Sequence, residues 1–233
     1  MLFSTGIAVR VQNPNQELCL TFDDGPGEHT ADISKYLRDQ GISATFFLIG
    51  SFAQARPSVV EQLLKDGHCI GNHTQNHPDL RQLDEEAVAK EIQDAHGALR
   101  PFLKKQGARP IFFRAPYGGW KTFPNLNEYW CDGEKLGEIY QGPVHWDFDG
   151  ADWWHWQNAE SGDDDVALKA AVAHHASADG GIVLMHDNNY ESDLASKNQT
   201  YRMIRQLIPI WKSRGCTFIS LQEISRSQRL NAH

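Results

Sequence analysis

The chain has 233 residues, a formal net charge of −8 and a pI of about 5.7. An acidic chain without a basic run is not expected to bind nucleic acid or an anionic membrane. No apolar stretch approaches the roughly 20 residues of a membrane-spanning helix. The length suits one domain over residues 1–233 with a sizeable core.

Apolar runs and helical periods alternate along the chain. Strands are predicted at 18–22, 44–49, 68–72, 111–113, 144–148, 181–185 and 217–221. Helices are predicted from Thr30 as the cap to Gly41, from Pro57 to Gly67, from Asp84 as the cap through Leu103, and at 163–178 and 201–211. Residues 118–143 are predicted to form a long loop with a short helix. The alternation indicates βαβ units and a parallel sheet, and therefore an α/β fold.

The cysteines and the N-terminal residues give information on the cellular location of the protein. Cys19, Cys69, Cys131 and Cys216 are too few for a disulfide scaffold, and no C-x-x-C pair indicates a thiolate metal site. Cys19 and Cys69 lie in apolar runs and are predicted to be buried thiols. The sequence does not decide whether one disulfide forms among the four cysteines. No signal peptide is predicted. The protein is therefore expected to be cytoplasmic as the sequence stands, or secreted to the cell wall if a leader has been removed.

Two adjacent carboxylates, Asp23 and Asp24, follow the first predicted strand. Neighbouring strand residues point to opposite sides, so both can face one site only where the strand pattern breaks. Gly25-Pro26 is predicted to supply that break. A divalent cation is the commonest reason for two charged carboxylates to lie side by side.

Other polar side chains also follow predicted strands directly. They are His73, Arg114, the pair Asp149 and Asp152, and His186. Because the C-terminal ends of barrel strands gather at one face and build the active site, these segments are predicted to converge. His73 and His77 with one carboxylate would form a ligand set typical of a catalytic zinc site. The alternative is a pair of surface or capping histidines.

Together these segments resemble the polysaccharide deacetylases of the fourth carbohydrate esterase family, the nodulation-type chitooligosaccharide deacetylase homology domain, and are most like chitin deacetylases. The resemblance spans residues 18–187 and implies a distorted (β/α) barrel of seven or eight parallel strands. It rests on segments in the family's order, namely Thr21-Phe22-Asp23-Asp24-Gly25, His73-Thr74-Gln75-Asn76-His77, Arg114-Ala115-Pro116-Tyr117, Asp149-Gly150-Ala151-Asp152-Trp153 and Leu184-Met185-His186.

The resemblance implies the central chemical roles. Asp24, His73 and His77 would bind the metal, usually zinc, and cobalt, nickel or manganese could replace it. Asp23 would be the general base for the attacking water. His186 would be the general acid that protonates the departing amine.

Further matched residues would support the base Asp23 and the acid His186. Asp152 would raise the proton affinity of His186, and Arg114 would keep Asp23 ionised and oriented. Without the resemblance, a structural ion pair would be the favoured interpretation of Arg114 and Asp152. The backbone N–H of Tyr117 would stabilise the oxyanion. The pocket for the acetyl methyl group would be walled by Trp153 and Leu184.

The aromatic residues in and after the long loop have two interpretations. Trp120, Trp130 and Tyr140 are either core residues or a stacking platform for sugar rings. Trp154 and Trp156 are either core residues or part of the cleft rim.

The predicted function is that of a metal-dependent N-deacetylase, acting as a monomer on the N-acetylglucosamine units of chitin or chitooligosaccharides. A peptidoglycan N-deacetylase and an acetylxylan O-esterase stay open, because one catalytic set serves amides and esters and the loops around the cleft decide. An inactive carbohydrate-binding module and a metal-independent amidohydrolase are disfavoured, because the base, ligands and acid are all present.

Overall fold

The computed structural model describes residues 16–107, 110–159 and 164–225, and a parallel sheet lies at its centre. The sheet order is β3-β2-β1-β9-β8, and every neighbouring pair is parallel. The strands are β1 (Glu17–Gly25), β2 (Thr45–Leu48), β3 (Cys69–Asn72), β8 (Phe148–Asp149) and β9 (Gly181–His186). The predicted α/β class with parallel strands is confirmed.

Further parallel strands extend this arrangement. A single bridge between Asn72 and Phe113 connects β3 to β4 (Ile111–Phe112), which pairs with β7 (Tyr140–Gln141). The strand β10 (Thr217–Phe218) pairs with the first residues of β1. Within the described ranges β7 and β8 are not paired, so the series of strands does not close by hydrogen bonds.

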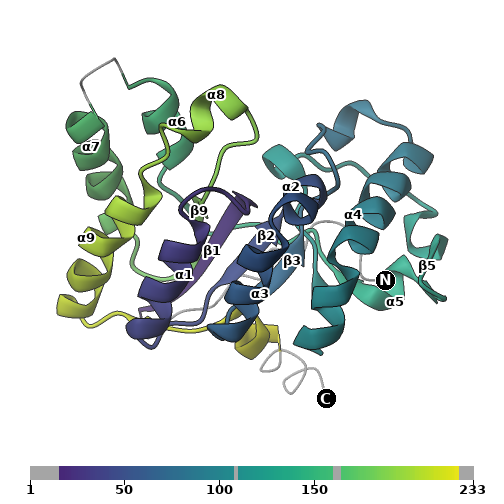
Figure 1. Ribbon diagram of the computed structural model, residues 1–233, viewed down its shortest axis with the longest axis horizontal. Coiled ribbons are helices and arrows are strands. Elements are labelled where there is room, and N and C mark those ends of the chain that lie inside the picture. The colour runs from purple at the N-terminus through teal and green to yellow at the C-terminus, as the bar shows by residue number, and fades with distance from the viewer. Residues whose placement is uncertain (1–15, 108–109, 160–163, 226–233) are drawn as a thin grey trace.

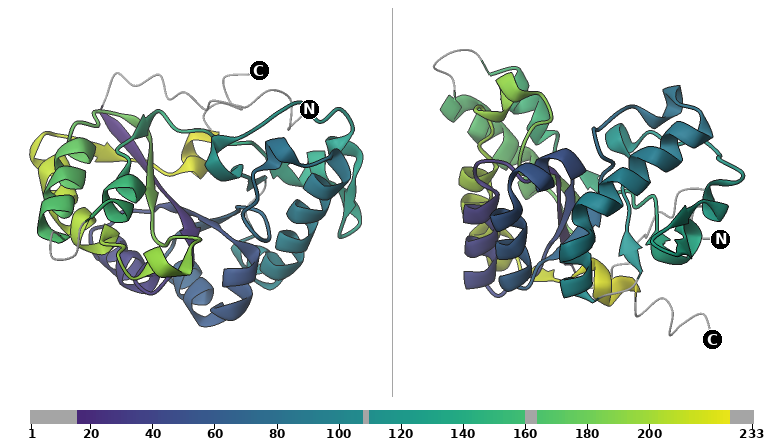
Figure 2. Two further views of the ribbon diagram at one scale, coloured as in Figure 1. Left: turned by 90° about the horizontal axis from the view of Figure 1, so that it is seen from above. Right: turned by 45° about the vertical axis from the view of Figure 1, so that its right-hand side comes forward.

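Helices flank the strands, as Figure 1 shows with α7 and α9 on one side and α4 on the other, and Figure 2 shows from two further directions. The longer helices are α1 (Thr30–Asp39), α3 (Pro57–Lys65), α4 (Glu85–Gln106), α7 (Asp164–Ala176) and α9 (Thr200–Ser213). The shorter ones are α2 (Gly50–Ala55), α5 (Leu136–Ile139), α6 (Asp152–Gln157), α8 (Ser192–Ala195), and the 3-10 turns η1 (Leu80–Gln82), η2 (Pro116–Gly118) and η3 (Leu126–Glu128). The strands β5 (Trp130–Cys131) and β6 (Glu134–Lys135) form a small antiparallel hairpin.

The helix α4 follows the sequence prediction closely. Its cap is Asp84, whose Oδ1 accepts a hydrogen bond of 2.8 Å from the backbone N–H of Ala87. Val88, Ile92 and Leu99, spaced along one helical face, are fully buried. This face packs against β3, which leads directly into His73.

Several local predictions are wrong. The predicted strand 217–221 ends at Phe218, and residues 118–143, predicted as a loop with a short helix, also contain β5, β6 and β7. Thr30 is the first residue of α1 and does not cap it, because its hydroxyl donates to the buried carboxylate of Asp187. The predicted strand 144–148 shortens to β8. The N–H of Val144 instead donates to Phe113 O at 2.8 Å, and its carbonyl oxygen accepts from Arg114 Nε at 3.0 Å, so its backbone bonds to the two residues that follow β4.

All four cysteines are free, and the predicted burial of Cys19 and Cys69 is confirmed. Burial raises the pKa of the Cys69 thiol to about 12, which makes it unreactive near neutral pH. Across the described ranges, none of the helices combines the length and apolar character needed to cross a membrane.

Candidate active site

A cavity of about 260 Å³ opens at the C-terminal ends of β1, β3 and β9. The residues predicted from the sequence that line it are Asp23, Asp24, His73, His77, Tyr117, Trp153, Leu184 and His186. The two other predicted residues, Arg114 and Asp152, are fully buried behind this lining. Every segment that was expected to converge therefore does so.

A β-bulge brings the two adjacent carboxylates to one side. The strand β1 continues through both Asp23 and Asp24 to Gly25, and its register against β2 shifts between Asp23 and Gly25. Asp24 has a positive φ of 71°, a conformation that L-residues rarely adopt. The break in the strand pattern therefore lies at Asp24 itself, and the sequence prediction placed it one residue too late.

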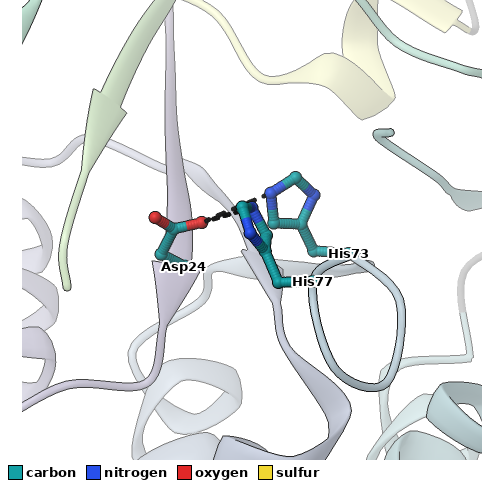
Figure 3. A group of neighbouring side chains, drawn as sticks. All are labelled: Asp24, His73 and His77. Carbon is teal, nitrogen blue, oxygen red and sulfur yellow. Dashed lines mark ion pairs between the residues drawn. The ribbon is translucent and has the colours of Figure 1, made fainter. Parts of the chain in front are cut away.

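Asp24, His73 and His77 point toward one another from two segments (Figure 3). The Nε2 atoms of His73 and His77 lie 3.4 and 3.1 Å from Asp24 Oδ1. All three side chains are buried, and their ligand atoms lie within 4.8 Å of one another. The structure thus gathers the predicted metal ligands.

The donor chemistry of this trio fits a divalent cation. His73 Nδ1 lies 2.8 Å from the carbonyl oxygen of Arg114, which can only accept, so Nδ1 carries a hydrogen and Nε2 is the nitrogen left to bind a cation. Asp24 Oδ1 is buried without a hydrogen-bond partner. Two imidazole nitrogens and one unpartnered carboxylate oxygen are a typical zinc ligand set.

The protonation state of Asp24 also suits a ligand. Burial raises the pKa of its carboxyl group, but the adjacent imidazoles of His73 and His77 and the charge of His186 lower it more. The net pKa lies well below the usual range for an aspartate. Asp24 is therefore ionised, as a metal ligand must be.

Backbone strain concentrates at this site. Positive φ angles occur at Asp24, Thr74, His77 and Tyr117, and at Ala151, which directly precedes Asp152. Such conformations cost of order 1–3 kcal/mol each and persist only where the surrounding structure enforces them. The surrounding fold thus holds these residues in strained conformations, which lowers the stability of the protein.

Arg114 holds the second carboxylate. Its Nη1 donates to Asp23 Oδ1 and to Thr21 Oγ1, each at 2.8 Å. The guanidinium also lies over the ring of Phe47, with Cζ 4.2 Å from the ring centroid. Asp23 is therefore fixed through one oxygen, and its Oδ2 lies 3.7 Å from His73 Nε2, beside the ligand trio.

His186 and Asp152 form the second predicted pair. His186 Nδ1 lies 2.8 Å from Asp152 Oδ1, and Asp152 Oδ2 accepts from the backbone N–H of His186, also at 2.8 Å. Burial lowers the pKa of His186, but Asp152, Asp24 and Asp23 raise it by more, to about 10. His186 is therefore protonated near neutral pH, and its Nε2 remains for the cavity that it lines.

The aromatic residues of the long loop do not form a platform at this cavity. Tyr140 is fully buried, and its hydroxyl accepts from Asn72 Nδ2 at 2.9 Å, next to His73. Trp120 packs against the core. Trp130, Trp154 and Trp156 also lie outside the lining; the first two are exposed and the third is buried.

Tyr190 and Glu191 are site residues that the sequence reasoning missed. The Tyr190 ring stacks on His77, with centroids 4.6 Å apart and an interplanar angle of 24°. Tyr117 contacts the same imidazole at 4.7 Å. Both Tyr190 and Glu191 line the cavity. Their position in the loop directly after His186, at a strand end, was the available signal.

The sequence of this chain is similar to those of known proteins. The family model described as Polysaccharide deacetylase matches residues 10–125. A chitooligosaccharide deacetylase of Bradyrhizobium sp. (strain ANU 289) is 33% identical over 203 residues, which cover 84% of each chain. A peptidoglycan-N-acetylglucosamine deacetylase of Bacillus cereus is 32% identical over 216 residues and 91% of each chain.

A solved structure of a peptidoglycan N-acetylglucosamine deacetylase superposes with a TM-score of 0.68 at 27% identity, over 91% of this chain and 88% of that one. Deacetylase structures of this kind have a distorted (β/α) barrel, which agrees with the open series of parallel strands described above.

Proposed function

The chain belongs to the polysaccharide deacetylase family, and on that premise we propose that it hydrolyses the acetamide of N-acetylglucosamine units in chitin or chitooligosaccharides, giving glucosamine units and acetate. The observation that carries the proposal is the meeting of a ligand trio, a carboxylate base and a protonated histidine in one cavity. We propose that residues 1–233 act as one catalytic domain and as a monomer.

Enzymes of this family depend on a metal, and Asp24, His73 and His77 would hold it here. A divalent cation bound at such a site lowers the pKa of water and polarises the acetyl carbonyl. We propose zinc, because two histidines and one carboxylate are typical of catalytic zinc. Cobalt, nickel and manganese accept the same ligands.

Asp23 is proposed as the general base. Arg114 occupies its Oδ1, so Oδ2 is the atom that accepts the proton of the attacking water. The oxygen of that water forms the new bond to the acetyl carbon. The backbone N–H of Tyr117 would stabilise the negative charge that develops on the carbonyl oxygen. The methyl group would lie between the side chains of Trp153 and Leu184, which line the cavity.

His186 is proposed as the general acid. Asp152 binds Nδ1, so Nε2 is the nitrogen that delivers a proton to the amide nitrogen as the C–N bond breaks. An amine leaves poorly as an anion, and a protonated imidazole removes that difficulty. The proton taken by Asp23 and the one given by His186 balance the hydrolysis.

The replacement Asp152→Asn is expected to move the alkaline limit of activity to lower pH. Asp152 is the main group that raises the pKa of His186, and removing an opposite charge in contact changes a pKa by about 1–3 pH units. Because His186 acts while protonated, kcat should fall at a lower pH than in the wild type. The pH profile of kcat checks this, with the exposed Asp165→Asn variant as the control. An unmoved alkaline limb would contradict the assigned role.

The first test of the proposed function is acetate release from N-acetylglucosamine oligomers with added zinc and with a chelator. We expect release with zinc, its loss with the chelator, and recovery when zinc is added back. Undiminished release in the presence of excess chelator would contradict a metal-dependent reaction.

A second substrate class has an observation in its favour, since the peptidoglycan-N-acetylglucosamine deacetylase of Bacillus cereus is nearly as similar as the chitooligosaccharide enzyme. Peptidoglycan and acetylated xylan therefore belong in the same assay. Release from one of these, without release from chitooligosaccharides, would keep the mechanism and overturn the substrate.

A further inference from the structure

The cavity carries negative charge beyond its catalytic groups. Asp149 and Glu191 also line it, and the lining within the described ranges contains no lysine or arginine. The other acidic residues of the lining, Asp23 and Asp24, are buried and held by Arg114 and by the histidines. Asp149 and Glu191 are exposed residues of the same lining.

Short-range bonds hold both carboxylates in place. Asp149 Oδ1 accepts from the backbone N–H of Ala151 at 2.7 Å. Glu191 Oε1 accepts from the Tyr190 hydroxyl at 2.8 Å, and its own backbone N–H donates to Asn189 Oδ1 at 2.9 Å. These charges therefore stand at defined places on the wall.

The two carboxylates come from segments next to neighbouring strands of the sheet. Asp149 ends β8, and Glu191 lies in the loop that follows β9, and these strands are neighbours at one end of the sheet order. The ligands His73 and His77 and the ring of Tyr117 come from the β3 and β4 side. Asp149 and Glu191 are thus two acidic side chains of the cavity lining, and together they are called the acidic wall here.

Exposed rings lie beside this acidic wall. Trp153 is 41% exposed and Tyr190 is 38% exposed, and both line the cavity, as does Tyr117. Aromatic side chains of this kind offer an apolar face with a polar edge, which suits contact with a sugar ring. Asp24, whose Oδ1 belongs to the ligand trio, lines the same cavity. Sugar contact, ligand site and acidic wall are therefore parts of one cavity.

We infer that Glu191 and Asp149 select substrates by charge, so that the enzyme prefers oligosaccharides with a free amino group, as in partly deacetylated chitooligosaccharides, over neutral ones, and rejects glycans that carry carboxylates. This inference rests on the proposed function and names the substrate class of the same site. The ammonium group of a glucosamine unit would be attracted to the acidic wall. The carboxylate of a muramic acid unit would be repelled by it.

The expected size of the effect follows from partly exposed ion pairs. Such a pair changes an equilibrium by about two- to fivefold, and salt screens it. With two carboxylates acting together, kcat/KM should fall by about tenfold from the cationic to the neutral oligomer, and further for an anionic one. The differences in kcat/KM among the cationic, neutral and anionic oligomers should become smaller when the ionic strength rises from about 0.01 M to about 1 M.

The experiment compares kcat/KM for acetate release from three oligomers of equal length. One is fully acetylated chitotetraose, one carries a single glucosamine unit, and one contains muramic acid with a free carboxylate. Glu191→Gln and Asp149→Asn are measured beside the wild type. Both changes keep the hydrogen-bond acceptor, so the bonds from Tyr190 and Ala151 survive while the charge is lost. Glu86→Gln, an exposed residue of α4 outside the lining, removes the same charge as a control.

The expected result is a ratio of cationic to neutral kcat/KM that drops by about threefold in each cavity variant and stays unchanged in the Glu86→Gln control. Equal rates on all three oligomers, or an unchanged ratio in both cavity variants, would overturn the inference while leaving the deacetylase intact. Absence of acetate from every substrate would overturn the proposed function and this inference with it.

Discussion

The replacement Asp23→Asn is expected to lower kcat for acetate release by about 10²–10⁴-fold, the usual contribution of general base catalysis. The amide oxygen of an asparagine can keep the hydrogen bond from Arg114 Nη1, which Asp23 Oδ1 accepts at 2.8 Å. Its nitrogen replaces Oδ2 and cannot take a proton from water. The geometry should therefore survive while the base is lost.

The metal content of variants distinguishes the role of Asp23 from that of the metal ligands. The Asp23→Asn variant should retain its metal, because Asp24, His73 and His77 are unchanged. Asp24→Asn should lose metal affinity, because it removes the anionic ligand. The measurements are kcat with saturating oligomer and metal per protein by elemental analysis. A metal-loaded Asp23→Asn enzyme with kcat within threefold of the wild type would show that another group accepts the proton.

The replacement Arg114→Met is expected to destabilise the protein by about 3–5 kcal/mol, because a buried carboxylate loses its cation. Arg114 is fully buried and binds Asp23, Thr21 and the carbonyl oxygen of Val144. Methionine fills much of the space beside Phe47 but supplies none of these hydrogen bonds. The midpoint of thermal unfolding should fall by roughly 6–20 °C for a chain of this size.

Two further variants identify the cause of this loss. Arg202→Met breaks the exposed ion pair with Asp165 and should cost less than about 1 kcal/mol. The double variant Asp23→Asn with Arg114→Met should recover part of the stability, because the unpaired charge is gone. Free energies of unfolding from denaturant titration provide the comparison. Strictly additive losses in the double variant would mean that Arg114 stabilises the fold through its other contacts alone.

The strand ends and the pair of histidines four residues apart could be predicted from the sequence, because they depend on local pattern. Buried parallel strands are read from apolar runs, and the residues that follow them directly, such as His73 and His186, must lie at one face. The cap at Asp84 and the buried face of α4 were equally local and are confirmed. The resemblance to a known family then supplied a role for each of these residues.

Contacts between distant segments could not be predicted in this way. The bulge at Asp24 depends on the pairing of β1 with β2, and the irregular path of 144–148 depends on Val144 bonding to Phe113 and Arg114. Periodicity reports whether a residue is buried and does not report which backbone groups it bonds. The pairing of Arg114 with Asp23 likewise joins residues 91 positions apart.

The local sequence by itself determined an α/β chain with polar side chains at its strand ends, because hydrophobic period and turn residues are properties of neighbouring positions. Only the tertiary structure decided what surrounds the ligand trio. It buried Tyr140 beside Asn72, left Trp130 outside the cavity, and brought Tyr190 onto His77. It also brought Asp149 and Glu191 into the lining of the same cavity, from segments next to the paired strands β8 and β9.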